Sequence, residues 1–158
     1  MEPRQVRTAA DARELVESRG AQHVKVGVFD IDGIMRGKYI SRDKFISSLD
    51  GGFGFCDVVL GWDCQDQLYD NVKYTGWHTG YPDAPVRILP DTCRELPFED
   101  NGLFFLGEFS PPSETVCPRA LLRRVLERGR SMGYEAYAGL EYEFFVFKET
   151  PESVREKN

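Results

Sequence analysis

Two strands joined by a tight turn are the strongest constraint on how this chain can fold. Val24, Val26 and Val28 alternate with smaller or polar residues, which is the pattern of a strand with one buried face. An Asp-Gly pair at residues 32–33 follows, and this dipeptide is typical of two-residue hairpin turns. Residues 34–40 can supply the returning strand. We therefore predict an antiparallel hairpin here.

Short helices and further strands are predicted on either side of a long irregular stretch. Residues 8–19 and 41–50 have helical apolar spacing, and each ends at glycine. Residues 51–85 are rich in Gly, Asp and aromatic residues and show no sustained period, as in a functional or mobile loop. Strands are predicted at residues 86–89 and 103–109. Together these elements predict a small α+β domain of roughly one hundred residues.

A second unit is predicted after the Pro/Ser-rich stretch at residues 110–114. A strongly amphipathic helix begins at Pro118, places its apolar side chains on one face and stops at Gly133. Residues 134–147 have the composition of a strand or a strand pair. Because one helix and such a strand cannot bury their apolar faces alone, we expect this second domain to be incomplete.

Charge and hydropathy argue against a nucleic-acid-binding protein and against a membrane protein. The 158 residues carry a formal net charge of −6, with no basic cluster or stripe, which argues against a nucleic-acid partner or a polybasic membrane anchor. No stretch approaches the roughly 20 apolar residues of a membrane span, so we expect a cytoplasmic protein. The four cysteines form no CxxC pair, so we expect reduced thiols and no zinc.

Glu141 and Glu143 stand two residues apart in an aromatic run. In a strand they would point to the same face, and neighbouring carboxylates attract hard divalent ions such as Mg²⁺ or Mn²⁺. The alternative is a solvated sheet face that happens to carry both.

Asp30 and Asp32 admit a different chemistry. An apolar strand followed by D-x-D-G resembles the first motif of haloacid-dehalogenase-like phosphatases, in which one Asp attacks phosphorus and the second acts as the acid. The later acidic pair that this family needs has no counterpart here. The alternative is structural: Asp32 lies in the turn, and the Asp30 carboxylate accepts hydrogen bonds from nearby backbone N–H groups.

Three stretches, considered together, match the pattern of one family. They are residues 29–38 (FDIDGIMRGK), 80–91 (GYPDAPVRILPD) and 139–147 (GLEYEFFVF). The chain resembles the N-terminal part of a glutamine synthetase, and its last stretch is similar to the family's G-x-E-x-E-F-F-x-F signature. The match covers residues 20–147 in the family's order.

This resemblance implies a fold and an activity. It implies an N-terminal helix at residues 1–19, a β-grasp domain at 20–112 and the beginning of an α/β catalytic domain at 113–158. The family transfers phosphate from ATP to glutamate and then joins the γ-glutamyl phosphate to ammonia or an amine. Its subunits form rings with active sites between neighbours. Glu141 and Glu143 would each bind one Mg²⁺ or Mn²⁺ ion.

The resemblance also assigns Asp63 and Asp66. They lie where ammonia-dependent members carry F-D-G-S-S, whose Asp binds and deprotonates ammonium; Asp63 takes that position and Asp66 lies nearby. The Gly-Ser-Ser is absent, which is more like relatives that build γ-glutamylamides. Alternatively, Asp63 caps a turn, and Trp62 packs against the loop.

Because the other metal ligands and the nucleotide-binding segments have no counterpart, we expect this chain alone to be inactive. A non-catalytic β-grasp module that serves assembly is the alternative function.

Overall fold

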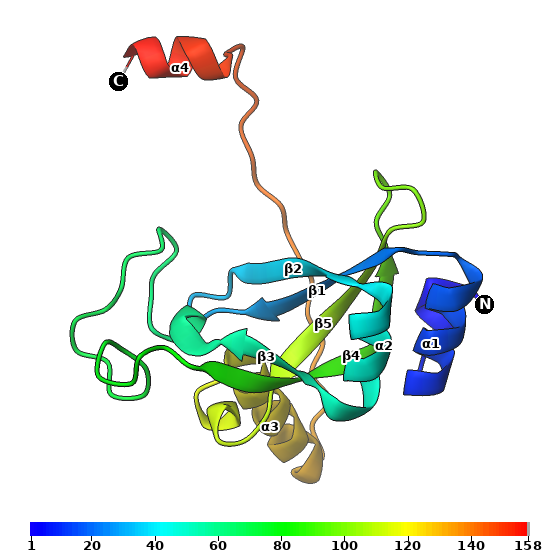
Figure 1. Ribbon diagram of the computed structural model, residues 1–158. Helices are drawn as coiled ribbons and strands as arrows, with labels where there is room; N and C mark the ends of the chain where they lie inside the picture. Colours follow the sequence, from blue (N-terminus) through cyan, green and yellow to red (C-terminus); the bar gives the residue numbers. More distant parts are fainter. Residues whose placement is uncertain (158) are drawn as a thin grey trace.

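A computed structural model describes residues 1–157, in which a single five-stranded sheet of order β2-β1-β5-β4-β3 carries the fold (Figure 1). The strands are β1 (His23–Phe29), β2 (Met35–Ser41), β3 (Phe53–Cys56), β4 (Asp83–Glu95) and β5 (Leu103–Phe109). The α-helices are α1 (Ala9–Ser18), α2 (Arg42–Gly51), α3 (Pro118–Ser131) and α4 (Pro151–Lys157). Three single turns of 3-10 helix, η1 (Pro3–Gln5), η2 (Asp57–Leu60) and η3 (Ser113–Thr115), complete the regular structure. The α+β prediction is confirmed.

The predicted hairpin is confirmed. β1 and β2 pair antiparallel with Val24 opposite Ile40 and Val28 opposite Arg36. Gly33 takes a φ of 80° in the connecting turn, a left-handed conformation that glycine adopts without steric cost. On its other side β1 pairs parallel with β5, so the first and last strands of the sequence lie together in the middle of the sheet.

Two strands differ from the prediction. β4 runs to Glu95, past Pro90. Proline has no N–H to donate to a neighbouring strand, but Pro90 lies in the register irregularity between Leu89 and Arg94, where the regular ladder of hydrogen bonds is interrupted. β3 lies inside the stretch expected to be loop. Its four residues are too few to show a period, and it is a strand because it pairs antiparallel with β4.

Opposite faces of the sheet are covered by different helices. The rings of Phe45 in α2 and Phe105 in β5 lie 4.7 Å apart, and both side chains are fully buried. Glu108 of β5 has the opposite parity to Phe105 and meets Arg119 and Arg123 of α3. The main apolar core therefore lies on the α2 side, and α3 lies on the other side (Figure 1).

Charged groups attach α3 to the sheet. Glu108 is buried, and its carboxylate accepts from Arg87 of β4 at 2.6 Å and from Nε of Arg123 at 3.3 Å. The amphipathic helix is confirmed, but the apolar face that was predicted for it is exposed: Leu121, Leu122 and Val125 are 54–58% accessible.

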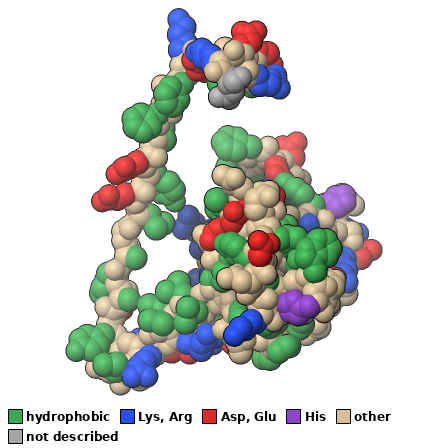
Figure 2. All heavy atoms as spheres, turned by 90° about the vertical axis from the view of Figure 1, so that its left-hand side faces the viewer, with side chains coloured by type: hydrophobic (Ala, Val, Ile, Leu, Met, Phe, Trp, Pro, Cys, Tyr) green, Lys and Arg blue, Asp and Glu red, His purple; other side chains and the backbone are tan. Residues whose placement is uncertain are grey.

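The predicted strand at residues 134–147 is wrong in this structure. The segment runs away from the sheet in an irregular, extended course, and the aromatic side chains along it are exposed, as the green spheres beside the main body in Figure 2 show. A strand exists only where a neighbour accepts and donates its backbone hydrogen bonds, and residues 1–157 offer none to this segment. Within the same residues, no helix combines the length and apolar character that a membrane crossing demands.

A buried carboxylate fixes the hairpin turn. The Asp30 side chain is 0% exposed, and its Oδ1 accepts from the backbone N–H groups of Asp32 at 3.0 Å and Ile34 at 2.8 Å. Its Oδ2 accepts from Nε of Arg36 at 2.7 Å. These contacts confirm the structural interpretation of Asp30 and leave it inaccessible as a nucleophile, so the phosphatase hypothesis is not favoured.

Truncating Phe105 tests the core. Phe105→Ala removes a ring from between β5 and α2, and we expect it to lower the free energy of unfolding by about 3–5 kcal/mol. Urea denaturation followed by circular dichroism measures the loss. Phe98→Ala is the control, because that ring is 98% exposed and its removal should change stability by less than about 0.5 kcal/mol. Equal losses in the two variants would contradict the described core.

Removing the Asp30 carboxylate tests the turn. Asp30→Ala leaves the Arg36 guanidinium without its buried partner, and we expect a loss of about 3 kcal/mol, the low end for a broken buried pair, since Arg36 remains partly exposed. Asp32→Ala, an exposed residue of the same turn, should cost less than about 0.5 kcal/mol. Similar midpoints for both variants in urea would show that Asp30 does not hold the turn.

Candidate functional site

The structure brings the hairpin turn and the long loop together around Arg36. Nη1 of Arg36 lies 2.6 Å from Oδ1 of Asp66, and its Nη2 donates to the backbone oxygen of Asp63 at 3.4 Å. With Asp30 on Nε and the ring of Trp62 beneath the guanidinium, 4.9 Å from Cζ, these five residues form what we term the Arg36 cluster. Figure 1 shows this end of the β1–β2 hairpin beside the loop that follows η2.

The cluster is electrostatically unbalanced toward negative charge. It holds one guanidinium and three carboxylates, a formal charge of −2. The hydrogen bond that Arg36 donates to Asp30, and after it the one that it donates to Asp66, raise the pKa of Arg36 against the opposing effect of partial burial. Next to the cluster, partial burial and then the charges of Asp32 and Asp63 raise the pKa of Tyr69. The site therefore favours a cation over an anion.

Asp63 caps a turn, as the structural alternative predicted. Its Oδ1 accepts from the backbone N–H groups of Gln65 at 2.8 Å and Gln67 at 2.9 Å. Its Oδ2 makes no hydrogen bond within residues 1–157. Asp66 is placed in the same turn by a left-handed backbone, with φ of 63°. Trp62 packs against the core.

The base of the loop is anchored by a buried polar pair. The hydroxyl of Thr75 donates to Oδ1 of Asp57 at 2.6 Å, and both residues are at least 96% buried. Sequence reasoning missed this pair, because neither residue stands in a distinctive pattern. It also missed the role of Arg36, although this arginine belongs to the R-G-K stretch that carried the family resemblance.

Glu141 and Glu143 lie outside this cluster. Both are exposed on the extended segment at residues 134–147, and no hydrogen bond or ion pair joins either to the Arg36 cluster. No group of three or more His, Cys, Asp or Glu side chains in the described part of the chain is arranged to hold a metal ion. The oxygen donors suit Mg²⁺ or Mn²⁺ chemically, but two carboxylates would leave most of the six positions around such an ion to water or to other ligands.

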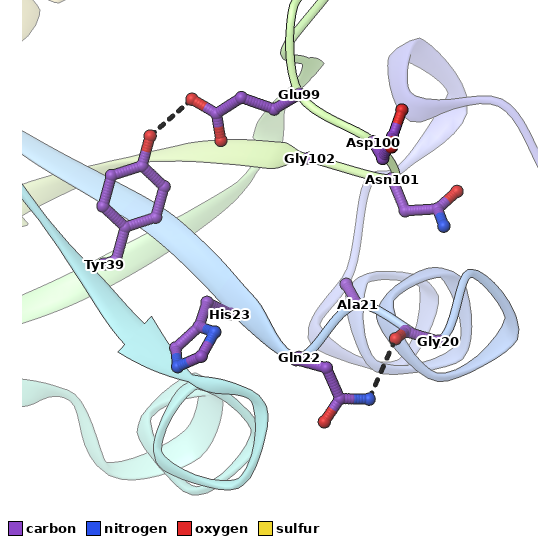
Figure 3. A pocket seen from close by; sticks show the side chains of 9 residues that line it. All are labelled: Gly20, Ala21, Gln22, His23, Tyr39, Glu99, Asp100, Asn101 and Gly102. Carbon is purple, nitrogen blue, oxygen red and sulfur yellow. Dashed lines mark hydrogen bonds between the residues drawn. The ribbon is translucent and has the colours of Figure 1, made fainter.

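A separate open pocket lies at the opposite end of the hairpin (Figure 3). Its volume is about 540 Å³, and its polar lining includes Gln22, His23, Tyr39, Glu99 and Asn101. The hydroxyl of Tyr39 bonds to the carboxylate of Glu99 across it. None of the residues predicted from the sequence to act at a site lies in this pocket.

Comparison with known proteins identifies the family. The family model described as "Glutamine synthetase, catalytic domain" matches residues 115–158. The "Type-1 glutamine synthetase 2" of Dictyostelium discoideum is 43% identical over 139 residues, which cover 85% of this chain and 26% of that protein. The "Glutamate--isopropylamine ligase" of a Pseudomonas species is 31% identical over 149 residues, covering 90% of this chain and 32% of the relative.

The fold comparison agrees. The cryo-electron-microscopy structure of Plasmodium falciparum glutamine synthetase matches 80% of this chain and 23% of its own, with a TM-score of 0.56 and 16% identity. The chain thus spans roughly a quarter to a third of the length of these proteins. Over the residues that it contains, the chain belongs to the glutamine synthetase family.

Proposed function

We propose that this chain is the N-terminal part of an ATP-dependent ligase that joins glutamate to ammonia or an amine through γ-glutamyl phosphate. The observation that carries the proposal is the catalytic-domain match at residues 115–158, which includes Glu141 and Glu143. Relatives named as a glutamine synthetase and as a glutamate–isopropylamine ligase support the two acceptor classes. The proposal places the protein in nitrogen metabolism in the cytoplasm.

The proposed domain division follows the sheet. Residues 20–112 would be a β-grasp domain, for which a hairpin, a helix and a parallel pairing of the first and last strands give support. Residues 1–19 would be an N-terminal helical extension, and residues 113–158 the first part of the catalytic domain. A ring of subunits would place this sheet against the catalytic domain of a neighbour.

Glu141 and Glu143 are proposed as ligands of Mg²⁺ or Mn²⁺. Their exposure and lack of protein partners leave all four oxygens free for this role. The ions would neutralise phosphate charge as ATP phosphorylates glutamate. Since the described residues supply only two ligands, the 158-residue chain would be inactive alone.

Asp63 is proposed as the group that binds the incoming amine. Its Oδ1 is committed to the turn, whereas its Oδ2 is free to accept from an ammonium, and the negative cluster favours such a cation. Asp66 is occupied by Arg36, so it is the weaker candidate for direct contact. The Trp-Asp-Cys-Gln sequence in place of Phe-Asp-Gly-Ser supports an amine acceptor rather than ammonia.

Phosphate release tests the ligase proposal. The 158-residue chain should release no phosphate from ATP in the presence of glutamate, Mg²⁺ and a panel of ammonia, isopropylamine and ethanolamine. A chimera that continues residue 147 of this chain into the remaining sequence of the Dictyostelium relative should release phosphate only when glutamate and an acceptor are both present. Phosphate release by the 158-residue chain would show that it is active alone. A chimera that assembles but releases no phosphate would refute the ligase proposal.

Charge-removing substitutions test the metal ligands in the same chimera. Glu141→Gln and Glu143→Gln should each raise the Mg²⁺ concentration for half-maximal activity at least about 10-fold, since even outer-shell changes cost 10–100-fold in metal affinity. Glu135→Gln, an exposed glutamate on the same segment, is the matched control and should leave the titration unchanged. A metal dependence identical to the parent's in both motif variants would exclude Glu141 and Glu143 as ligands.

A further inference from the structure

Arg36 connects the β1–β2 hairpin to the loop that follows η2, beside a backbone hydrogen bond from Ile31 to Val59. Nε holds Asp30 at the end of β1, Nη1 holds Asp66, and Nη2 reaches the backbone of Asp63. The face of the guanidinium lies over Trp62. One planar group therefore links the β1–β2 hairpin to the turn at residues 62–67, and the planarity of its fork fixes the direction of each bond.

The turn itself has little else to hold it. Cys64, Gln65, Asp66 and Gln67 are all exposed, so apolar burial contributes little to the conformation of their backbone. Internal order comes from the Asp63 cap and from backbone hydrogen bonds between residues 63 and 66–67. These bonds define the shape of the turn, while Trp62 packs its beginning against the core and the Arg36–Asp66 ion pair ties its exposed side to β2.

We propose that Arg36 is a positioning residue: through Asp66 it holds this turn so that Asp63 presents its free Oδ2 to the amine. The role of Asp63 rests on the proposed function, whereas the attachment of the turn by Arg36 does not. Arg36 is in turn immobilised by the buried Asp30, which places the anchor in the core and the presented carboxylate at the surface.

Asp66→Asn is the most informative variant. It removes the charge that pairs with Arg36 but keeps the shape of the side chain, and asparagine tolerates the φ of 63° at this position as readily as aspartate does. Because Asp66 is more than half exposed, the variant will fold, whereas Arg36→Met would also leave Asp30 unpaired in the core.

Amide hydrogen exchange on the 158-residue chain tests the attachment. The N–H groups of Gln65 and Gln67 should exchange about 1.4- to 5-fold faster in Asp66→Asn, the range that corresponds to a partly exposed ion pair. Salt near 1 M should remove most of the difference between parent and variant. Asp50→Asn, which breaks the exposed Arg13–Asp50 pair at 3.2 Å, is the control and should leave both amides unchanged. Unchanged exchange in Asp66→Asn overturns the proposal.

Kinetics on the chimera test the role in amine use. Asp66→Asn should raise KM for the amine by up to about 5-fold with kcat and KM for ATP unchanged, because a smaller fraction of the protein holds Asp63 ready. Faster exchange with an unchanged amine KM overturns the positioning role. If the parent chimera has no activity, the ligase proposal fails and the role in amine use fails with it, while the exchange result still decides whether Arg36 holds the turn.

Discussion

The buried carboxylate of Asp30 is the interaction on which this end of the molecule depends. A buried carboxylate loses its hydration and needs hydrogen-bond donors from the protein instead. Two backbone N–H groups and one guanidinium supply them here. The backbone donors close the hairpin turn, and the guanidinium then extends the same order to a loop thirty residues further along the chain. Turn geometry and loop placement therefore share one origin.

The parts of the fold that sequence predicted are those with a local cause. The valine alternation and the Asp-Gly turn produce the β1–β2 hairpin, and the apolar spacing after Pro118 produces α3. β3 and the far half of β4 were missed because their pairing partners, rather than their own residues, make them strands. The same reasoning explains the error at residues 134–147, whose composition favours a strand but which meets no pairing partner.

The candidate site shows a similar division. Asp63 was identified by its position relative to a family pattern, and the turn that it caps was foreseen as the alternative. In the structure Oδ1 of Asp63 caps the turn, which leaves Oδ2 for the amine contact that we propose. Arg36 could not be assigned from spacing, because its partners lie 6, 27 and 30 positions away in the chain. Glu141 and Glu143 stand apart from this cluster, so the predicted chemistry is divided between two surfaces.

α3 reverses the usual arrangement of a surface helix. Arg119 and Arg123 reach Glu108 on the sheet, whereas Leu121 and Leu122 are exposed. Ion pairs orient α3 on the sheet from its inner side. Its outer side carries exposed apolar side chains, which can pack against a further apolar surface. Because Glu108 is only 2% exposed, salt screens these ion pairs much less than it screens surface pairs, so a kosmotropic salt would strengthen the tendency of the outer side to associate while leaving the inner attachment in place.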